Sequence, residues 1–172
     1  MLRRDLRIHD PKLFREIERD QLPFRSPHPR TFLSKKGYKT VIVDGEIFND
    51  VTKVYIVKRG VYIGKGGRIK RKRGVDYNRY GSVGLYPMGS DPYNLGRDYW
   101  ETHSHVDLKL QNKGIGLYLY KRLIDYALRH GIKVVSSNSR NNKSDAVWQR
   151  LRKLYRIRYR KANDRFYVLG ER

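Results

Sequence analysis

The stretch that decides the fold is WETHSHVDLKLQNKGIG, residues 100–116. Apolar or small side chains alternate with charged and histidine side chains over 100–110, which predicts a strand. The glycine-punctuated segment 111–116 predicts a tight turn. Over 115–130 apolar residues recur at helical spacing, and Gly131 follows as a natural C-terminal cap. The segment therefore predicts a strand, a turn and a helix in direct succession.

The chain beyond this helix predicts a strand, a second helix and a hairpin. Residues 132–137 form a short β-branched run. Asn142 or Ser144 is the expected N-cap of the second helix. Residues 157–159 and 166–169 are expected to pair as the two strands of a hairpin. The buried stripe of the second helix is expected to hold Val147, Trp148, Leu151, Leu154 and Tyr155.

The N-terminal half predicts further strands. They lie at 38–43, at 51–57, where β-branched residues dominate, and at 82–88. Asp44-Gly45 is a hairpin-turn signal directly after the first of them. Together with the later elements they predict an α/β (α+β) protein.

Two basic segments fall outside this pattern. Residues 1–37 are expected to form a basic N-terminal arm, in which Asp10-Pro11 opens a short helix and prolines keep residues 21–37 extended. Residues 64–99 are a basic insertion rich in glycine and tyrosine. We therefore expect the arm and one domain, residues 38–172. The motif-bearing core of that domain is 100–169.

Composition excludes several classes of protein. The chain has 172 residues, enough for one domain with its own core. It has no cysteine, which excludes disulfide scaffolds, thiolate zinc sites and a cysteine nucleophile. No apolar run approaches the ~18–20 residues that a bilayer span needs, so we expect no membrane contact. A cytoplasmic location is the expectation, which for a phage-encoded protein means the host cytoplasm or the virion.

The net charge points to an acidic partner. Lys plus Arg is 39 against 17 Asp plus Glu, a formal charge of +22. Basic residues cluster over 58–79 and 150–165 with tyrosines between them, a combination that neutralises phosphates and stacks on bases. A merely solvated basic face is the alternative to a nucleic acid or acidic protein partner. The candidate nucleic-acid contacts are Lys70, Arg71, Lys72, Arg73, Arg156, Arg158 and Arg160.

The turn at 111–116 has the form Gln-x-x-Gly-x-Gly between a strand and a helix. The first backbone N–H groups of a helix have no intrahelical acceptor, and the helix dipole adds positive potential there. Gly114 and Gly116 let a bulky phosphate approach these groups, and Gln111 and Lys113 offer further donors. The turn is therefore a candidate anion site, although a tight turn alone would also explain the glycines.

This motif, in this order of elements, resembles the GNAT superfamily of acyl-CoA-dependent N-acyltransferases. Their signature Gln/Arg-x-x-Gly-x-Gly/Ala is matched by Gln111, Gly114 and Gly116. Ser136 to Leu151 looks like the version common in bacteriophage acetyltransferase-like proteins. The resemblance implies a splayed, mostly antiparallel mixed sheet flanked by helices, with acetyl-CoA bound along the turn. The cofactor-binding residues that it implies are Leu110, Gln111, Asn112, Lys113, Gly114, Ile115, Gly116, Asn142 and Ser144.

The resemblance also bears on catalysis. By register, Trp148 stands where many family members carry a tyrosine acid. Backbone N–H groups near Leu108 to Leu110 are expected to hold the oxyanion. The candidate general bases are Glu101, His103 and His105, which with Asp107 are expected to share one face of the strand. A solvent-facing strand side would show the same alternation. His103 and His105 lack a third metal ligand nearby, so no metal is expected.

Two functions therefore compete. The first is an acyl-CoA-dependent N-acyltransferase that transfers an acetyl group to an amine. The second is a catalytically inactive module of the same fold. This module would bind nucleic acid or serve as a basic virion, assembly or host-takeover component of a phage, and a large assembly is one partner considered for it.

Overall fold

The computed structural model describes residues 28–43, 52–59, 80–87 and 99–172. The expected helix at Asp10, the hairpin turn at Asp44-Gly45 and most of the insertion at 64–99 lie outside the described residues.

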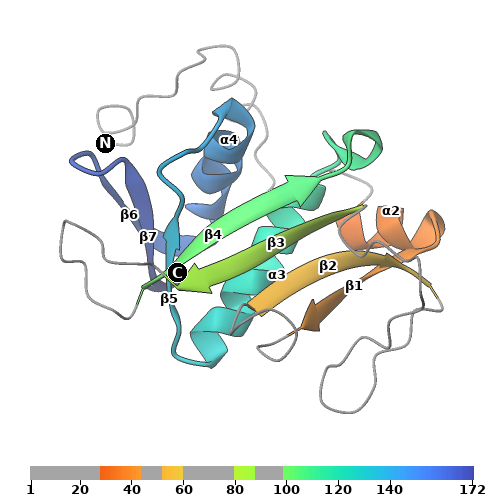
Figure 1. The fold of residues 1–172 in the computed structure, drawn as a ribbon, viewed down its shortest axis with the longest axis horizontal. Coiled ribbons are helices and arrows are strands. Elements are labelled where there is room, and N and C mark those ends of the chain that lie inside the picture. The colour runs from red at the N-terminus through yellow and green to blue at the C-terminus, as the bar shows by residue number, and fades with distance from the viewer. Residues whose placement is uncertain (1–27, 44–51, 60–79, 88–98) are drawn as a thin grey trace.

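Seven strands form one sheet, in the order β1-β2-β3-β4-β5-β7-β6. Only β4 and β5 run parallel, and every other neighbouring pair is antiparallel. The mixed, mostly antiparallel sheet is thus confirmed (Figure 1). The strands are β1 (Tyr38–Val43), β2 (Thr52–Lys58), β3 (Gly81–Pro87), β4 (Tyr99–Val106), β5 (Lys133–Ser136), β6 (Tyr155–Arg160) and β7 (Arg165–Glu171).

Helix α3 (Ile115–Arg129) covers one face of this sheet and closes the main core. Its apolar residues recur every three or four positions, so Leu119, Leu123 and Ala127 are fully buried against the strands. Figure 1 shows α3 behind β2 and β3, with α4 (Asn142–Leu151) beside it. The crossover from β4 through α3 to β5 is what makes these two strands parallel.

Helix α2 (Pro29–Lys35) corrects the expectation that residues 21–37 are extended. Pro29 occupies the first helical turn, where its missing N–H breaks no hydrogen bond. His28 caps this turn, because its Nδ1 accepts a hydrogen bond of 3.2 Å from the Arg30 N–H. Leu33 is buried in the core, so this part of the expected arm packs on the domain. The prolines here begin a helix rather than prevent one.

Two element ends also differ from expectation. The strand predicted over 100–110 ends at Val106, and Leu108–Leu110 form a 3-10 helix. Asn141, not Asn142 or Ser144, is the N-cap of α4, and Ser144 completes a reciprocal capping box with it. The hairpin of β6 and β7 is confirmed.

The sheet opens between its two parallel strands. Residues 99–102 of β4 pair with residues 133–136 of β5. Beyond this, β4 continues to Val106, whereas the chain leaves β5 after Ser136 and enters the loop before α4. The two strands therefore diverge beyond Thr102, and this divergence positions the site.

Candidate functional site

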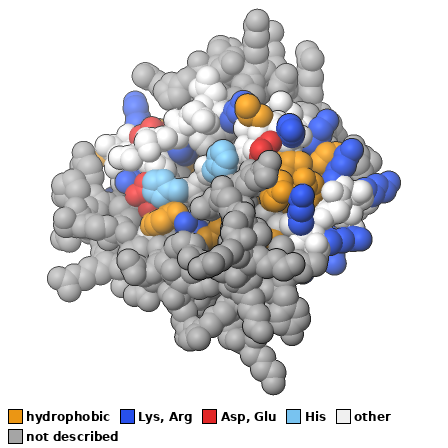
Figure 2. Space-filling view, turned by 45° about the vertical axis from the view of Figure 1, so that its right-hand side comes forward, with side chains coloured by type: hydrophobic (Ala, Val, Ile, Leu, Met, Phe, Trp, Pro, Cys, Tyr) orange, Lys and Arg blue, Asp and Glu red, His pale blue; other side chains and the backbone are white. Residues whose placement is uncertain are grey.

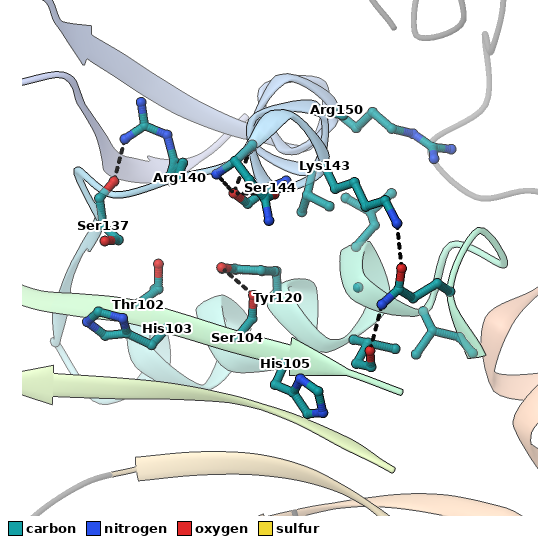
Figure 3. Close-up of a pocket in the computed structure, with 18 of the residues that line it drawn as sticks. Thr102, His103, Ser104, His105, Tyr120, Ser137, Arg140, Lys143, Ser144 and Arg150 are labelled. Atoms are coloured by element: carbon teal, nitrogen blue, oxygen red, sulfur yellow. Dashed lines mark hydrogen bonds between the residues drawn. The ribbon is translucent and has the colours of Figure 1, made fainter. Parts of the chain in front are cut away.

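A cavity of about 410 Å³ occupies the gap between the diverging strands. Four segments line it: β4 from Thr102 to Val106, the turn and first residues of α3, the loop after β5, and one face of α4. Figure 3 shows β4 and α3 on one side of this cavity and α4 with its preceding loop on the other. It is large enough to take part of a small ligand.

Gln111 holds the turn in place. Its Nε2 donates to the Val106 carbonyl oxygen at 2.9 Å, and its Oε1 accepts from Lys143 Nζ at 2.6 Å. The side chain was expected to face an anion directly. Instead it joins the end of β4 to the first turn of α4.

Asn112 and residues 114–117 line the cavity. Among the residues that the structure describes, none of their backbone N–H groups meets an acceptor. Gly114 precedes the helix in the left-handed conformation, with φ of 72°, and its carbonyl already accepts from Tyr118. Lys143 and Arg150 also line the cavity. Free amides at a helix start, with cations beside them, form an environment that favours an anion.

The expected cofactor-binding residues divide into two groups. Three of them are not among its lining residues: Leu110, which lies in the core, Lys113 and Asn142. Lys143, on α4, was missed because a lysine in a basic chain gives no distinguishing signal. The expected residues that do line the cavity are Gln111, Asn112, Gly114, Ile115, Gly116 and Ser144.

Hydroxyl groups line the end of the cavity nearest the point of divergence. Thr102 and Ser104 project from β4 toward Tyr120 of α3 (Figure 3). The Tyr120 hydroxyl donates to Ser104 Oγ at 3.1 Å. Burial raises the pKa of Tyr120, while nearby hydroxyl groups lower it in part. The sequence placed Tyr120 only on the flank of a helix, because a tyrosine at helical spacing usually belongs to a core.

The candidate bases do not all reach the cavity. Glu101 is not among its lining residues and pairs with Arg165, at 3.1 Å between Oε2 and Nη1. Its other oxygen lies 3.4 Å from His103 Nε2. His103 and His105 do line the cavity, on the side of β4 away from Thr102 (Figure 3). Figure 2 shows histidine and acidic side chains near one another at the surface.

Asp107 and the N–H groups after it have other roles. The Asp107 carboxylate accepts from the Lys109 N–H at 2.8 Å, and its carbonyl accepts from the Leu110 N–H at 2.9 Å. Of the N–H groups expected to hold the oxyanion near Leu108 to Leu110, those of Lys109 and Leu110 are thus already hydrogen-bonded to Asp107.

Trp148 belongs to the core. It is fully buried and stacks on Phe166, with 5.7 Å between ring centroids and 7° between planes. Trp148 also packs edge-to-face against Tyr120, with 5.6 Å between the ring centroids. Trp148, which the resemblance to the GNAT superfamily puts at the position of a tyrosine acid, thus contributes packing in this chain.

Arg140 is a cavity residue that sequence reasoning missed. Its side chain is only 4% exposed, and it pairs with Asp145 at 2.6 Å and with Asp164 at 2.7 Å. It also donates to Ser136 Oγ at 2.9 Å. These contacts join the loop before α4, the helix itself and the β6–β7 turn, so Arg140 fixes one wall of the cavity.

The candidate nucleic-acid residues are only partly placed. Lys70, Arg71, Lys72 and Arg73 lie outside the described residues. Arg156, Arg158 and Arg160 alternate along the edge strand β6, all exposed. Arg156 Nε donates to the Glu171 carbonyl oxygen at 3.1 Å, and the Arg160 guanidinium lies 6.0 Å from the Tyr167 ring centre.

Within residues 28–43, 52–59, 80–87 and 99–172, no three His, Asp or Glu side chains gather as metal ligands would. No helix in that same part of the chain is long and apolar enough to cross a membrane.

Comparison with known proteins adds a family match. Residues 75–152 match the model of the acetyltransferase (GNAT) family. No curated protein matches the chain. Among solved structures, a mutant cAMP-binding acyltransferase from Mycobacterium smegmatis is similar, at 11% identity and a TM-score of 0.43, over 92% of this chain and 53% of that one. This chain thus spans about half the length of that protein.

A second similar structure is a GCN5-related N-acetyltransferase from Kribbella flavida. It has 15% identity and a TM-score of 0.38, over 81% of this chain and 84% of that one. The order of strands and helices around the parallel pair β4 and β5 is that expected for a GNAT-like sheet. Residues 75–152 of this chain thus match the acetyltransferase (GNAT) family model, and the sheet around them has the expected GNAT-like order of strands.

Proposed function

We propose that the protein is an acyl-CoA-dependent N-acyltransferase whose site is the cavity between β4 and β5. One observation carries the proposal: Asn112 and residues 114–117, whose N–H groups are unpaired among the described residues, line this cavity together with Lys143 and Arg150. They would hold the diphosphate of coenzyme A. The cavity leads from these groups to the point where the strands meet.

Acyl-CoA, when bound, supplies an acyl group activated as a thioester for attack by an amine. A residue of this chain would then accept the proton that the amine loses. His103 is the best placed base, since it lines the cavity and its Nε2 faces Glu101, which leaves Nδ1 to accept a proton. His105 lines the same side and is the second candidate.

The test is calorimetric titration with CoA, acetyl-CoA and pantetheine. We expect CoA and acetyl-CoA to bind and pantetheine, which lacks the diphosphate, to bind at least tenfold more weakly. Equal binding of pantetheine would contradict the assigned role of the turn. No binding of CoA at millimolar concentration would remove the proposal. Thiol release from acetyl-CoA that depends on an added amine would then establish turnover.

A second function, as a basic module that binds nucleic acid, is favoured by a separate surface. Lys35, Lys36 and Lys58 are exposed, and the ring centres of Tyr38 and Tyr80 lie 4.9 Å apart. Lys58 Nζ lies 5.9 Å from the Tyr80 ring. Figure 2, which brings the α2 side forward, shows Lys and Arg side chains gathered around hydrophobic ones. Exposed cations beside aromatic rings suit a single strand of RNA.

Fluorescence anisotropy with a labelled single-stranded RNA tests this second function. Reversing Lys35, Lys36 and Lys58 to Glu should weaken binding more than the matched reversal of Arg156, Arg158 and Arg160. Binding should also fall steeply with salt. Equal effects would assign the binding to net charge, and no binding at 50 mM salt would exclude the function. Phage origin, a role in a large assembly and a cytoplasmic location stay predictions.

A further inference from the structure

The charge of the cavity bears on which amine it could accept. Among the described residues that line the cavity, none is Asp or Glu, whereas Arg140, Lys143 and Arg150 are cationic. Glu101 lies outside this lining and pairs with Arg165. An acceptor with several ammonium groups, such as a polyamine, would therefore meet cations and no carboxylate in the cavity.

One face of the sheet leads from the cavity to the edge strand β6. Four residues are paired in register across β4, β5, β7 and β6, so their side chains share this face: Glu101, Val135, Tyr167 and Arg158 (Figure 1). The ring centres of Tyr99 and Tyr167 lie 5.3 Å apart, which agrees with this register. The face is thus continuous from β4 to β6.

The two ends of this face differ in chemistry. At the cavity end, the His103 side chain is 51% exposed. At the β6 end, Arg158 and Arg160 are exposed, and no carboxylate of the residues that the structure describes pairs with either arginine. Three strand spacings separate the ends, about 14 Å, which about four residues of extended chain would span.

Exposed arginines without a carboxylate suit the carboxylates of a partner. Nucleic acid is the other polyanion, but Tyr167, the ring beside Arg160, is only 3% exposed and offers no surface on which a base could stack. We infer that the acceptor is an acidic polypeptide, whose amine enters at His103 and whose carboxylates, about four residues away, bind Arg158 and Arg160. The inference rests on the proposed acyl-CoA function.

The transfer itself has a simple balance. The amine nitrogen forms a bond to the acyl carbon, and the carbon–sulfur bond of the thioester breaks. The sulfur leaves with the electron pair, and His103 takes the proton that the amine loses. The arginines take no part in these steps and only position the acceptor.

The test uses two short peptides with a free N-terminal amine and a fluorescent label at the other end. One carries three aspartates from its fourth residue onward, and the other carries lysines at the same positions. In fluorescence anisotropy without CoA, we expect the acidic peptide to bind at least about fivefold more tightly, the effect of two exposed ion pairs. With acetyl-CoA, thiol release should be faster with the acidic peptide than with the basic one or with spermidine.

Charge reversal assigns the effect to the two arginines. The double variant Arg158→Glu, Arg160→Glu should prefer the basic peptide. The control Lys39→Glu, Arg129→Glu changes the net charge equally, on β1 and at the end of α3, and should keep the preference for the acidic peptide. Melting temperatures establish folding. Arg158→Ala, Arg160→Ala, which should abolish the preference, replaces the reversal if that variant does not fold.

The outcomes separate this inference from the proposed function. If CoA binds but the two peptides bind equally, or if the acidic peptide binds and is not acylated, the inference is overturned and the proposed function stands. A preference that persists in the reversed variant also overturns it. If single-stranded RNA displaces the peptide and loses its own affinity in that variant, the face binds nucleic acid instead. If neither CoA nor acetyl-CoA binds, the proposed function itself fails.

Discussion

Lys143 Nζ lies 2.6 Å from Gln111 Oε1, and this hydrogen bond joins the first turn of α4 to the turn that precedes α3. The same Gln111 side chain donates to the Val106 carbonyl oxygen. One side chain thus connects the end of β4, the turn and α4, three of the segments that line the cavity.

Gln111→Ala removes both hydrogen bonds. We expect the free energy of unfolding to fall by about 1–2 kcal/mol, measured by urea denaturation, because the donor and the acceptor each lose one partner. CoA affinity should fall as well, since the turn loses its anchor. Lys113→Ala, an exposed change two residues away, serves as the control. If both variants bind CoA like the unmodified protein, Gln111 does not hold the turn.

Gly114→Ala and Gly116→Ala form a matched pair. Gly114 has φ of +72°, and an added Cβ would lie 3.3 Å from Pro29 Cγ. Alanine there should destabilise the protein by at least about 1 kcal/mol. Gly116 lies inside α3, where a Cβ would make an ordinary contact of 3.6 Å with Val147 Cγ2. Alanine there should raise the melting temperature slightly through its helix propensity. The reverse order of stabilities would contradict this description of the turn.

Arg140→Met tests the wall of the cavity. It leaves the buried Asp145 without its partner, so we expect a loss of about 3–5 kcal/mol in the free energy of unfolding. The double variant Arg140→Met, Asp145→Asn should recover part of this loss, because the uncompensated carboxylate is gone. A single-variant loss below about 1 kcal/mol would show that the ion pairs are not holding the loop.

Tyr159 makes the stability depend on alkaline pH. The Tyr159 hydroxyl donates a hydrogen bond of 2.7 Å to Asp164 Oδ1. Burial, together with this carboxylate, raises the pKa of Tyr159 to about 12. The unfolded chain releases this proton near pH 10 and the folded chain near 12. The stabilisation is therefore complete below pH 10 and is lost as the pH rises through that window.

Tyr159→Phe should accordingly flatten the decline of stability between about pH 10 and 12. Urea denaturation at a series of pH values measures it, with Tyr38→Phe as a control. Parallel curves for Tyr159→Phe and the unmodified protein would show that this tyrosine does not titrate differently in the two states.

The sequence predicts those parts of the molecule that local pattern determines. The alternation before Val106, the glycine turn and the spacing of Leu119, Leu123 and Ala127 specify a strand, a turn and a helix, because each signal lies within one element. The end of β4 was not predicted, because the alternation of apolar and polar residues continues past it. The strand ends where the Asp107 carboxylate accepts a hydrogen bond from the Lys109 N–H.

The residues that form the walls of the site could not be predicted from the sequence alone. Arg140, Asp145 and Asp164 come from two loops and a helix, and their meeting depends on how the elements pack. Thr102 looked like any residue of an alternating strand. Thr102 lines the cavity because β5 ends opposite it, and no local pattern in the sequence marks that end.

The most direct measurement follows the backbone amides during a CoA titration, by ¹H–¹⁵N correlation NMR. The account predicts that the amide signals of Gly114, Ile115 and Gly116 shift most, because their N–H groups would take up the diphosphate. Pantetheine should leave these signals in place. Binding of CoA that moves other amides while these three stay unchanged would contradict the central claim.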